Sequence, residues 1–313
     1  MKYKRIREAT LLIFILSLVL LTGCAKSETS PIVIGVMSDV GAVPFLIADK
    51  KGFFKDRGLE VEIVVFKSAL DRDSALQTGN LDATMADMLS IVFYTEANLP
   101  IKMVAKTAGD YVMVTSPHIS LAAFNQSETP QIGISSNTVI EFATDMIAKA
   151  AGNEQQIESV AIPQMPVRLE MLRSGELDAA TLPEPLASAA VLSGGNIIGS
   201  TKNIGLEPGI LVFSEALADN TEATTGIFEA YNDAARWLNE NGDATIYDIL
   251  ISSLGFSELL KDDGVLPIYN AIEAPDAETF DAVSEWMFDK GLSKHKYSYD
   301  ALTDIHLLPE GNF

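Results

Sequence analysis

The chain reads Leu76-Gln77-Thr78-Gly79-Asn80-Leu81-Asp82-Ala83 and, further on, Leu172-Arg173-Ser174-Gly175-Glu176-Leu177-Asp178-Ala179. The Leu, Gly, Leu, Asp and Ala positions of the two stretches coincide at an offset of 96 residues, which relates Gly79 to Gly175. Two earlier stretches recur in the same order, because residues 34–36 parallel 132–134 and residues 48–52 parallel 148–152. Each match is weak alone, but the shared order of all three indicates an internal repeat of one structural unit.

Within each half, short apolar runs alternate with segments of helical periodicity. Continuous apolar runs such as residues 32–36 are typical of parallel strands that are buried on both faces. Such alternation predicts right-handed crossovers and a mainly parallel sheet in each half. The predicted strands are residues 32–36, 59–66, 83–85, 101–105, 131–135, 160–163, 179–182 and 197–198, with helices between them, among them 88–98, 139–151, 167–174 and 186–192.

After Gly209 the alternation ends. Residues 210–213 predict one more strand, and amphipathic helices are then predicted at residues 221–241, 244–254 and 276–290. We expect these last helices to return and cover the first half. The predicted α/β fold has two lobes, and the chain crosses between them near residues 107–116 and 202–210. Lobe 1 is predicted to comprise residues 31–106 and 211–313, and lobe 2 residues 107–210.

The N-terminal residues predict export from the cytoplasm. Four basic residues precede an apolar run at residues 11–21, and small residues follow it. This order is typical of a secretory signal peptide, which we place at residues 1–23. The run is too short for a membrane-spanning helix, which needs about 20 apolar residues. Residues 24–30 are polar and small, and are interpreted as a tether.

The signal peptide ends in Leu21-Thr22-Gly23-Cys24, which resembles the bacterial lipobox. In that motif the Cys is diacylated and becomes the first mature residue. The resemblance implies a protein anchored by lipid to the cell membrane on its extracytoplasmic side. The alternative is a buried thiol without a chemical role. Cys24 is the only Cys of the chain, which excludes an internal disulfide and a metal site made of several Cys residues.

The formal net charge of −21 bears on the possible partners. Binding to nucleic acid needs clustered Lys and Arg, so an acidic surface argues against it. The same charge argues against docking on anionic lipid headgroups without an acyl anchor. Solubility is a sufficient reason for so acidic a surface.

Three stretches carry a family resemblance: residues 48–62, residues 75–83 and Leu182-Pro183-Glu184-Pro185. They resemble the solute-binding proteins for aliphatic sulfonates, taurine and thiamine-precursor pyrimidines, over roughly residues 31–250. The resemblance implies the type II, Venus-flytrap fold of periplasmic binding proteins, with the ligand between the lobes. It also implies a monomer that docks on an ABC permease with its ATPase, and neither catalysis nor a cofactor. The ligand varies within this family, so the motifs do not identify it.

The ligand site is expected at the loops beyond the carboxyl ends of the strands, where open α/β sheets bind ligands. Residues 136–138 precede a predicted helix, so their N–H groups and hydroxyls could hold an anionic or carbonyl oxygen, or serve as a plain N-cap. Gly41 could allow close approach of a ligand, or relieve a turn. The candidate ligand-binding residues in these loops are Asp39, Gly41, Lys67, Asp87, Ser136, Asn137, Thr138 and Glu184.

These loops hold three acids and one base, Lys67. Arg72 and Arg168 follow loops, but both fall on predicted helices, where we interpret them as solvated. Sulfonate and phosphate sites commonly use Arg, because its planar guanidinium matches such oxyanions. The excess of acids therefore favours a ligand with N–H donors or a positive charge.

We accordingly predict that Glu184 and Asp39 bind donor groups of a nitrogen heterocycle related to thiamine precursors. An aliphatic sulfonate or taurine is the alternative. Glu184 is the stronger candidate, because two flanking prolines hold its backbone. Tyr111 lies near the same loops and could stack on a ring, as could Phe45 and Phe66, for which core packing is the simpler role. The prediction that an acid binds ligand donors would not apply to an acid that caps backbone amides instead.

Two enzymatic alternatives use different residues. A related pyrimidine synthase depends on a Cys-rich iron site and an active-site His. The His residues of this chain lie outside the predicted cleft loops and are interpreted as surface or structural residues: His118, His295 and His306. A periplasmic lyase or dehydratase would need an acid and a base, which Glu184 and Asp39 could supply. The sequence contains no GxSxG, HExxH or phosphate-loop motif.

Overall fold

A computed structural model describes residues 30–152, 157–241, 243–256, 258, 261 and 267–308. The predicted signal peptide, Cys24 and the tether up to residue 29 lie outside the described residues. Ile32–Phe313 forms one compact unit, to which the following description applies. Among the described residues, no helix has both the length and the apolar character needed to cross a bilayer.

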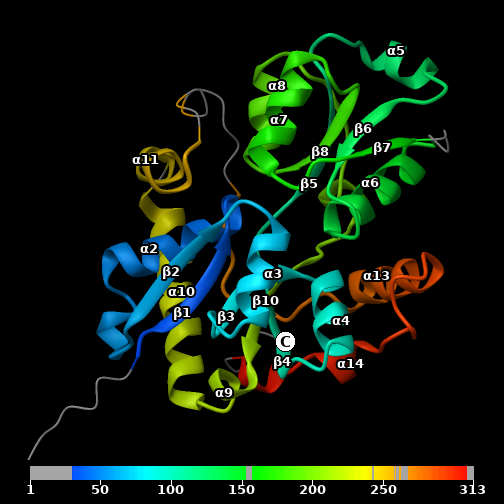
Figure 1. The fold of residues 1–313 in the computed structure, drawn as a ribbon. Helices are drawn as coiled ribbons and strands as arrows, with labels where there is room; N and C mark the ends of the chain where they lie inside the picture. The colour runs from blue at the N-terminus through cyan, green and yellow to red at the C-terminus, as the bar shows by residue number, and fades with distance from the viewer. Residues whose placement is uncertain are drawn as a thin grey trace, which may run out of the picture. The chain divides into compact units, whose positions relative to one another are not determined.

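The first sheet has five strands in the order β2-β1-β3-β10-β4 (Figure 1). β1 pairs in parallel with β2 and β3, whereas β10 is antiparallel to both β3 and β4. Four of the five strands therefore share one direction. The strands are β1 (Ile32–Met37), β2 (Val61–Phe66), β3 (Ala83–Asp87), β4 (Ile101–Lys106) and β10 (Gly209–Ser214).

The second sheet repeats this plan in the order β7-β6-β8-β5-β9. β6 pairs in parallel with β7 and β8, and β5 is antiparallel to β8 and β9. The prediction of an α/β fold with two mainly parallel sheets is confirmed. The strands are β5 (Tyr111–Thr115), β6 (Gln131–Ile134), β7 (Glu158–Ala161), β8 (Ala179–Pro183) and β9 (Ile197–Ser200).

The repeated stretch ends a helix and begins a strand in each half. Gly79 and Gly175 have left-handed backbone, with φ of 73° and 80°, which glycine adopts without a steric penalty. Three residues later, Asp82 and Asp178 each accept a hydrogen bond of 2.8 Å from a backbone N–H of the neighbouring strand. The next residue begins β3 or β8. The repeat therefore encodes a helix stop and a strand start.

Helices flank both sheets (Figure 1). Each helix that follows a strand at the carboxyl end of the sheet starts with a capping group or a proline. Pro44 lies in the first turn of α2, Ser68 caps α3, Asp87 caps α4 and Thr138 caps α6. The helices are α2 (Val43–Lys51), α3 (Ala69–Gln77) and α4 (Met88–Glu96) in the first half, and α5 (Leu121–Gln126), α6 (Val139–Ala150), α7 (Met165–Ser174) and α8 (Leu186–Leu192) in the second.

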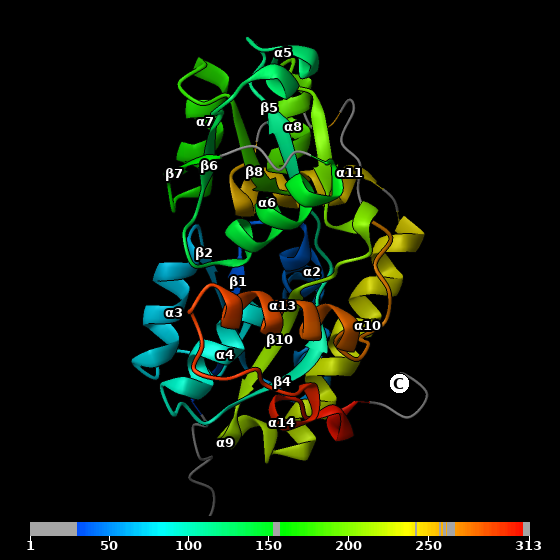
Figure 2. The ribbon, with the colours of Figure 1, turned by 90° about the vertical axis from the view of Figure 1, so that its right-hand side faces the viewer.

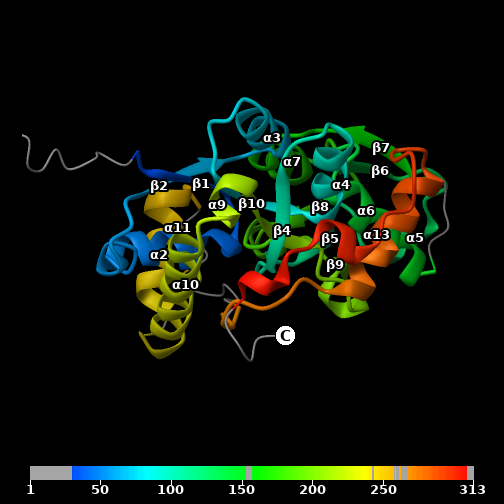
Figure 3. The same cartoon turned by 90° about the horizontal axis from the view of Figure 1, so that it is seen from below.

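The helices after β10 return to the first sheet, as expected. Figure 3 shows α10 and α11 beside α2, and the rings of Phe45 and Tyr231 meet edge to face with their centroids 5.2 Å apart. α13 packs on α4. These elements are α9 (Glu215–Ala218), α10 (Thr221–Asn241), α11 (Asp243–Leu254), α13 (Ala277–Asp289), α14 (Tyr299–Leu302) and the short η4 (Ile305–Leu307).

α13 also reaches the second half, which the sequence did not predict. Figure 2 shows it between α4 and α6. Trp286 donates a hydrogen bond of 3.0 Å from Nε1 to Asp145 of α6. Lys290 forms ion pairs with Glu141 at 2.7 Å and with Asp145 at 2.8 Å. Helices α13 and α6 therefore join the two halves away from the strands.

The segment interpreted as the first crossing contains a strand. Residues 107–116 were predicted to connect the lobes, but β5 occupies Tyr111–Thr115 and lies inside the second sheet. Its residues Val112, Met113 and Val114 are buried, which explains why this run is apolar. The connections between the two sheets are therefore residues 107–110 and 201–208. Helix α5 was also not predicted.

Candidate functional site

A cavity lies where the carboxyl ends of strands from both sheets face each other, as expected for this class of sheet. It measures about 660 Å³ with its mouth included. A cavity of this order suits a small organic ligand. Its wall comprises Met37, Asp39, Ala69, Arg72, Met85, Ala86, Asp87, Thr107, Ala108, Gly109, Asp110, Tyr111, Ser135, Thr138, Val139, Ile140, Pro163, Met165, Arg168, Pro183, Glu184 and Gly209.

Hydrogen bonds join the two halves around this cavity. The backbone N–H of Val40 donates to the carbonyl of Glu184 at 3.1 Å, and that of Met165 donates to the carbonyl of Lys67 at 3.3 Å. The Gln164 amide donates to Asp71 at 3.0 Å. The structure is therefore a closed arrangement of the two sheets.

Four of the eight candidate residues line the cavity: Asp39, Asp87, Thr138 and Glu184. The other four lie outside its wall. Gly41 packs so tightly that a Cβ would lie 2.5 Å from both the Ala108 carbonyl oxygen and the Met85 methyl carbon, so its close contact is with the chain itself.

Lys67 borders a separate hollow beside α7 and α8, so its ammonium group does not contribute to the cavity wall. Ser136 and Asn137 are exposed. The N–H of Asn137 donates to the Glu141 carboxylate at 2.7 Å. Of the three candidate residues of this loop, Thr138 alone lines the cavity, and its hydroxyl accepts from the N–H of Ile140 at 3.2 Å as an N-cap. Whether any of these residues binds a ligand stays a prediction.

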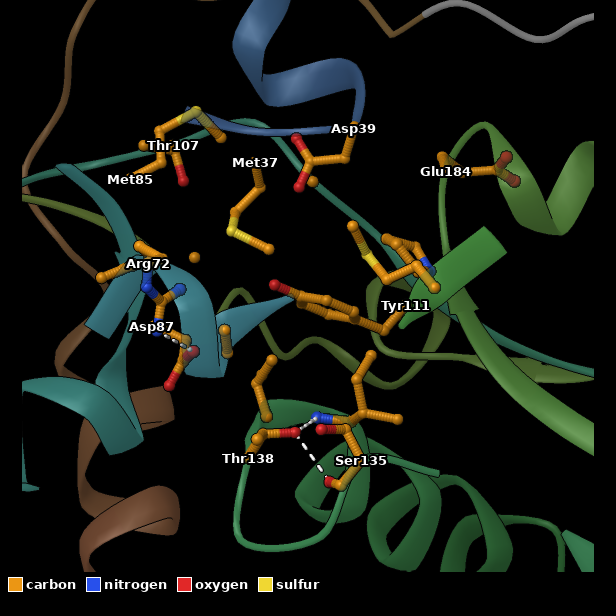
Figure 4. Close-up of a pocket in the computed structure, with 18 of the residues that line it drawn as sticks. Met37, Asp39, Arg72, Met85, Asp87, Thr107, Tyr111, Ser135, Thr138 and Glu184 are labelled. Atoms are coloured by element: carbon orange, nitrogen blue, oxygen red, sulfur yellow. Dashed lines mark hydrogen bonds and ion pairs between the residues drawn. The ribbon is translucent and has the colours of Figure 1, made fainter. Parts of the chain in front are cut away.

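The three candidate carboxylates on the cavity wall, those of Asp39, Asp87 and Glu184, each cap backbone amides. Asp39 accepts from the N–H of Gly41 at 2.9 Å, and Glu184 accepts from the N–H of Ser188 at 3.0 Å. Asp87 accepts from two N–H groups at the start of α4, at 3.1 and 2.9 Å. A carboxylate that accepts hydrogen bonds from backbone amides is less available to donor groups of a ligand, so this capping weakens the prediction that these acids bind such groups. In Figure 4 the Glu184 carboxylate turns toward α8, away from Tyr111, whereas the Asp39 carboxylate points into the cavity.

Burial raises the pKa of these acids. The pKa of Asp39 rises to about 7, because burial outweighs the hydrogen bonds from the backbone N–H groups of Gly41 and Ala42 and the attraction of Arg72. Burial also raises the pKa of Glu184, against the hydrogen bonds from Ser188. The Asp39 carboxyl therefore holds its proton to a higher pH than an ordinary aspartate does.

Tyr111 brings a hydroxyl donor into the cavity. Its hydroxyl points between Arg72 and Asp39 in Figure 4. Burial and the nearby carboxylates of Asp87 and Asp39 raise the pKa of Tyr111 well above its ordinary value, so the phenol stays protonated. Of the two other aromatic residues considered, Phe45 is fully buried in the core and Phe66 packs against the core from a half-buried position, and neither lies on the cavity wall.

The interpretation of Arg72 as solvated is wrong. Arg72 is 2 % exposed and lines the cavity, where Figure 4 shows it beside Asp87. Its Nη2 lies 2.8 Å from Asp73 and 3.5 Å from Asp87, and donates to the Ser90 hydroxyl at 2.7 Å. Tyr94 donates a short hydrogen bond to the same Asp73 oxygen. Arg72 is thus a buried cation with partners on α3, β3 and α4.

The interpretation of Arg168 as solvated is also wrong. Arg168 is fully buried and lines the cavity. Its Nη1 donates to the carbonyl of Ile162 at 2.8 Å, but Nε and Nη2 have no partner among the described residues. Burial lowers the pKa of Arg168 to about 10, which still leaves it charged at neutral pH. The prediction that Lys67 is the single base at the cavity is therefore wrong, because both arginines line the cavity and Lys67 does not.

The His residues of the chain lie away from the cavity. His118, His295 and His306 are exposed and do not line the cavity. Within the described part of the chain, no cluster of three or more His, Cys, Asp or Glu side chains could hold a metal ion.

Comparison with known proteins identifies a family and a fold. The model of the NMT1-like family matches residues 25–250. A comparison with curated protein sequences found no match. Two solved structures are similar at 15 % identity each. The ligand-binding component of an ABC-type import system from Staphylococcus aureus, with zinc bound, has a TM-score of 0.76 over 90 % of this chain and 99 % of its own.

The alkanesulfonate-binding protein SsuA from Xanthomonas axonopodis pv. citri, bound to MOPS, has a TM-score of 0.73 over 89 % of this chain and 99 % of its own. The periplasmic aliphatic sulphonate-binding protein SsuA from Escherichia coli has a TM-score of 0.71 at 13 % identity, over 91 % of this chain and 94 % of its own. At this level of identity the similarity shows the fold, which is that of periplasmic binding proteins.

Proposed function

The chain belongs to the NMT1-like family, and from that premise we propose that it is the solute-binding component of an ABC importer. The observation that carries the proposal is the cavity, whose wall comes from the carboxyl ends of both sheets. A ligand there would contact both halves at once. Binding then stabilises the closed arrangement, because the contacts with one half are lost when the halves separate.

The two connecting segments provide the hinge in this proposal. Residues 107–110 and 201–208 join the sheets, and all four residues of the first segment line the cavity. Small changes of φ and ψ in such short segments can rotate one sheet and its helices relative to the other. The hydrogen bonds from Val40 to Glu184 and from Met165 to Lys67 would break on opening.

The protein would act outside the cytoplasmic membrane, anchored through acyl chains on Cys24. The lipobox-like residues 21–24 support this localisation. Its partners would be a permease and the associated ATPase, to which a monomer delivers the solute.

Binding without catalysis is the better account of the carboxylates. A lyase would use Asp39 and Glu184 as an acid and a base on one ligand. Only Asp39 points into the cavity in Figure 4, and Glu184 is occupied as the cap of α8. Both carboxylates cap backbone amides, so the nitrogen-heterocycle ligand loses the support of Glu184 and keeps from Asp39 only the direction of its carboxylate. The sulfonate or taurine alternative gains support from the buried arginines.

The purified protein tests the proposed function directly. Denaturation should release a small molecule that mass spectrometry can identify, and that molecule should rebind in a one-to-one ratio in calorimetry. It should also return chemically unchanged after long incubation with the native protein. Turnover of the molecule that disappears in Glu184→Gln would contradict binding without catalysis.

A further inference from the structure

Arg72 and Arg168 occupy equivalent positions in the internal repeat. The offset that relates Gly79 to Gly175 also relates these two arginines. Helices α3 and α7 begin at Ala69 and Met165, so each arginine is the fourth residue of its helix. Both side chains are buried and both line the cavity. The repeat therefore places one arginine side chain from each half on the wall of the same cavity.

Among the residues that the structure describes, side-chain partners surround the arginine of the first half but not that of the second. Arg72 is surrounded by two carboxylates, a serine hydroxyl and the tyrosine that bonds to one of the carboxylates. The same offset replaces each of these side chains by one that cannot accept a hydrogen bond. Asp73, Asp87, Ser90 and Tyr94 correspond to Leu169, Pro183, Leu186 and Ala190.

The unpartnered groups of Arg168 form one edge of its guanidinium. Nη1 bonds to the Ile162 carbonyl, which fixes the orientation of the planar group. Nε and Nη2 have no partner in the part of the chain that the structure describes. These two nitrogens carry parallel N–H bonds, the arrangement that matches two oxygens of a carboxylate or sulfonate. A buried charge without a counter-charge is unfavourable, so a partner from outside the chain would restore the balance that Asp73 and Asp87 give Arg72.

We propose that Arg168 determines ligand class by binding an oxyanion, a sulfonate or carboxylate group of a small organic ligand, through Nε and Nη2. This inference rests on the proposed function. The rest of the ligand lies toward Asp39 and the hydroxyl of Tyr111, which face the same cavity. Access to Arg168 comes with opening, because Gln164 and Met165, at the start of its helix, carry hydrogen bonds that join the two halves.

The stability of the ligand-free protein distinguishes a binding role from a structural one. We would compare wild type with Arg168→Gln and Arg168→Met, and use Arg236→Gln on the exposed face of α10 as a control. If the guanidinium awaits a ligand, removing the unpaired charge leaves the melting temperature unchanged or raises it. A marked fall in the melting temperature in both variants would show a structural role and overturn the proposal.

The ligand measurement uses the molecule released from the wild type and a panel of taurine, butanesulfonate, butyrate and uncharged butyramide. We expect the released molecule, or a panel anion if none is released, to bind the wild type and Arg236→Gln equally and Arg168→Gln at least 100-fold more weakly. The sulfonate and carboxylate arms distinguish the two oxyanions. A neutral released molecule, or the absence of any Arg168-dependent anion binding, would overturn the inference. Failure of the proposed function would appear separately, as turnover of the released molecule by the wild type.

Discussion

Arg72 and Arg168 line one cavity from equivalent positions of two repeated halves, and within the described part of the chain Arg72 alone of the two has carboxylate partners. This asymmetry gives the cavity an electrostatic direction. Arg72 is paired with carboxylates of its own half, whereas Arg168 has no counter-charge among the described residues. A ligand with an anionic group is therefore expected to take one orientation between the sheets.

The buried carboxyl of Asp39 should make stability depend on pH. Its pKa is about 7 in the folded protein, against an ordinary value of 3.8. The folded state thus holds this proton more tightly, so stability is lost as pH rises from about 4 to 7 and stays low above that window. Asp39→Asn, which keeps an oxygen to cap Gly41, should be more stable than wild type at pH 8 by roughly 2–4 kcal/mol.

Urea unfolding of both proteins between pH 5 and pH 8 measures this difference. The advantage of Asp39→Asn should shrink at pH 5, where the wild-type carboxyl is protonated. An advantage that is constant across this range would show that the carboxyl of Asp39 is not the cause.

The tight contact at Gly41 predicts a steric effect on the connecting segment. In Gly41→Ala the new Cβ would lie 2.5 Å from the Ala108 carbonyl oxygen, so the segment must shift. We expect a loss of about 1–3 kcal/mol in the free energy of unfolding, typical of overpacking. Gly109→Ala is the matched control, because no atom of the described residues lies within 4 Å of a Cβ there. Equal losses in the two variants would exclude the contact as the cause.

The ion pairs of Lys290 should favour the closed arrangement. Lys290 lies on the C-terminal side of α13 and pairs with Glu141 and Asp145 of α6. Lys290→Met should weaken closure by roughly 0.5–1 kcal/mol, since the lysine is partly exposed. Ligand affinity should fall by a few-fold. Lys296→Met removes an ion pair with Glu285, which lies on α13 itself, and serves as control. If both variants lose affinity equally, the contact of α13 with α6 has no special role.

The lipobox-like residues predict membrane anchoring through Cys24. Cys24→Ala, expressed in a bacterium with lipoprotein processing, should appear in the soluble fraction, whereas wild type should remain with membranes. Mass spectrometry of the wild-type N-terminal peptide should show acyl chains on Cys24. A folded Cys24→Ala protein that still partitions with membranes would contradict this prediction.

Much of the fold could be predicted from the sequence, because its signals are local. The repeated stretch contains a glycine helix stop and an aspartate that bonds to the neighbouring strand, and both operate within a few residues. Strand β5 was missed because it directly follows the connection from the first sheet. Its partners in the second sheet are β8 and β9, which are distant in sequence. Local pattern does not encode such pairing.

The candidate site was predicted less completely. Asp39, Asp87 and Glu184 could be placed at the cavity because ligands of such sheets bind at the carboxyl ends of the strands, where these residues lie. The two arginines were missed because charged residues on helices are most often solvated. The signal that could have found them is their shared position in the repeat. The loss of Asp73 and Asp87 at the corresponding positions of the second half was a further signal.

The most direct test of the account is small-angle X-ray scattering with and without the small molecule released from the purified protein. The account predicts that removing this molecule by partial unfolding and refolding gives a larger radius of gyration, and that adding it back at saturation restores the smaller one. Binding that is demonstrated by calorimetry but leaves the radius unchanged would contradict a ligand held between two closing halves.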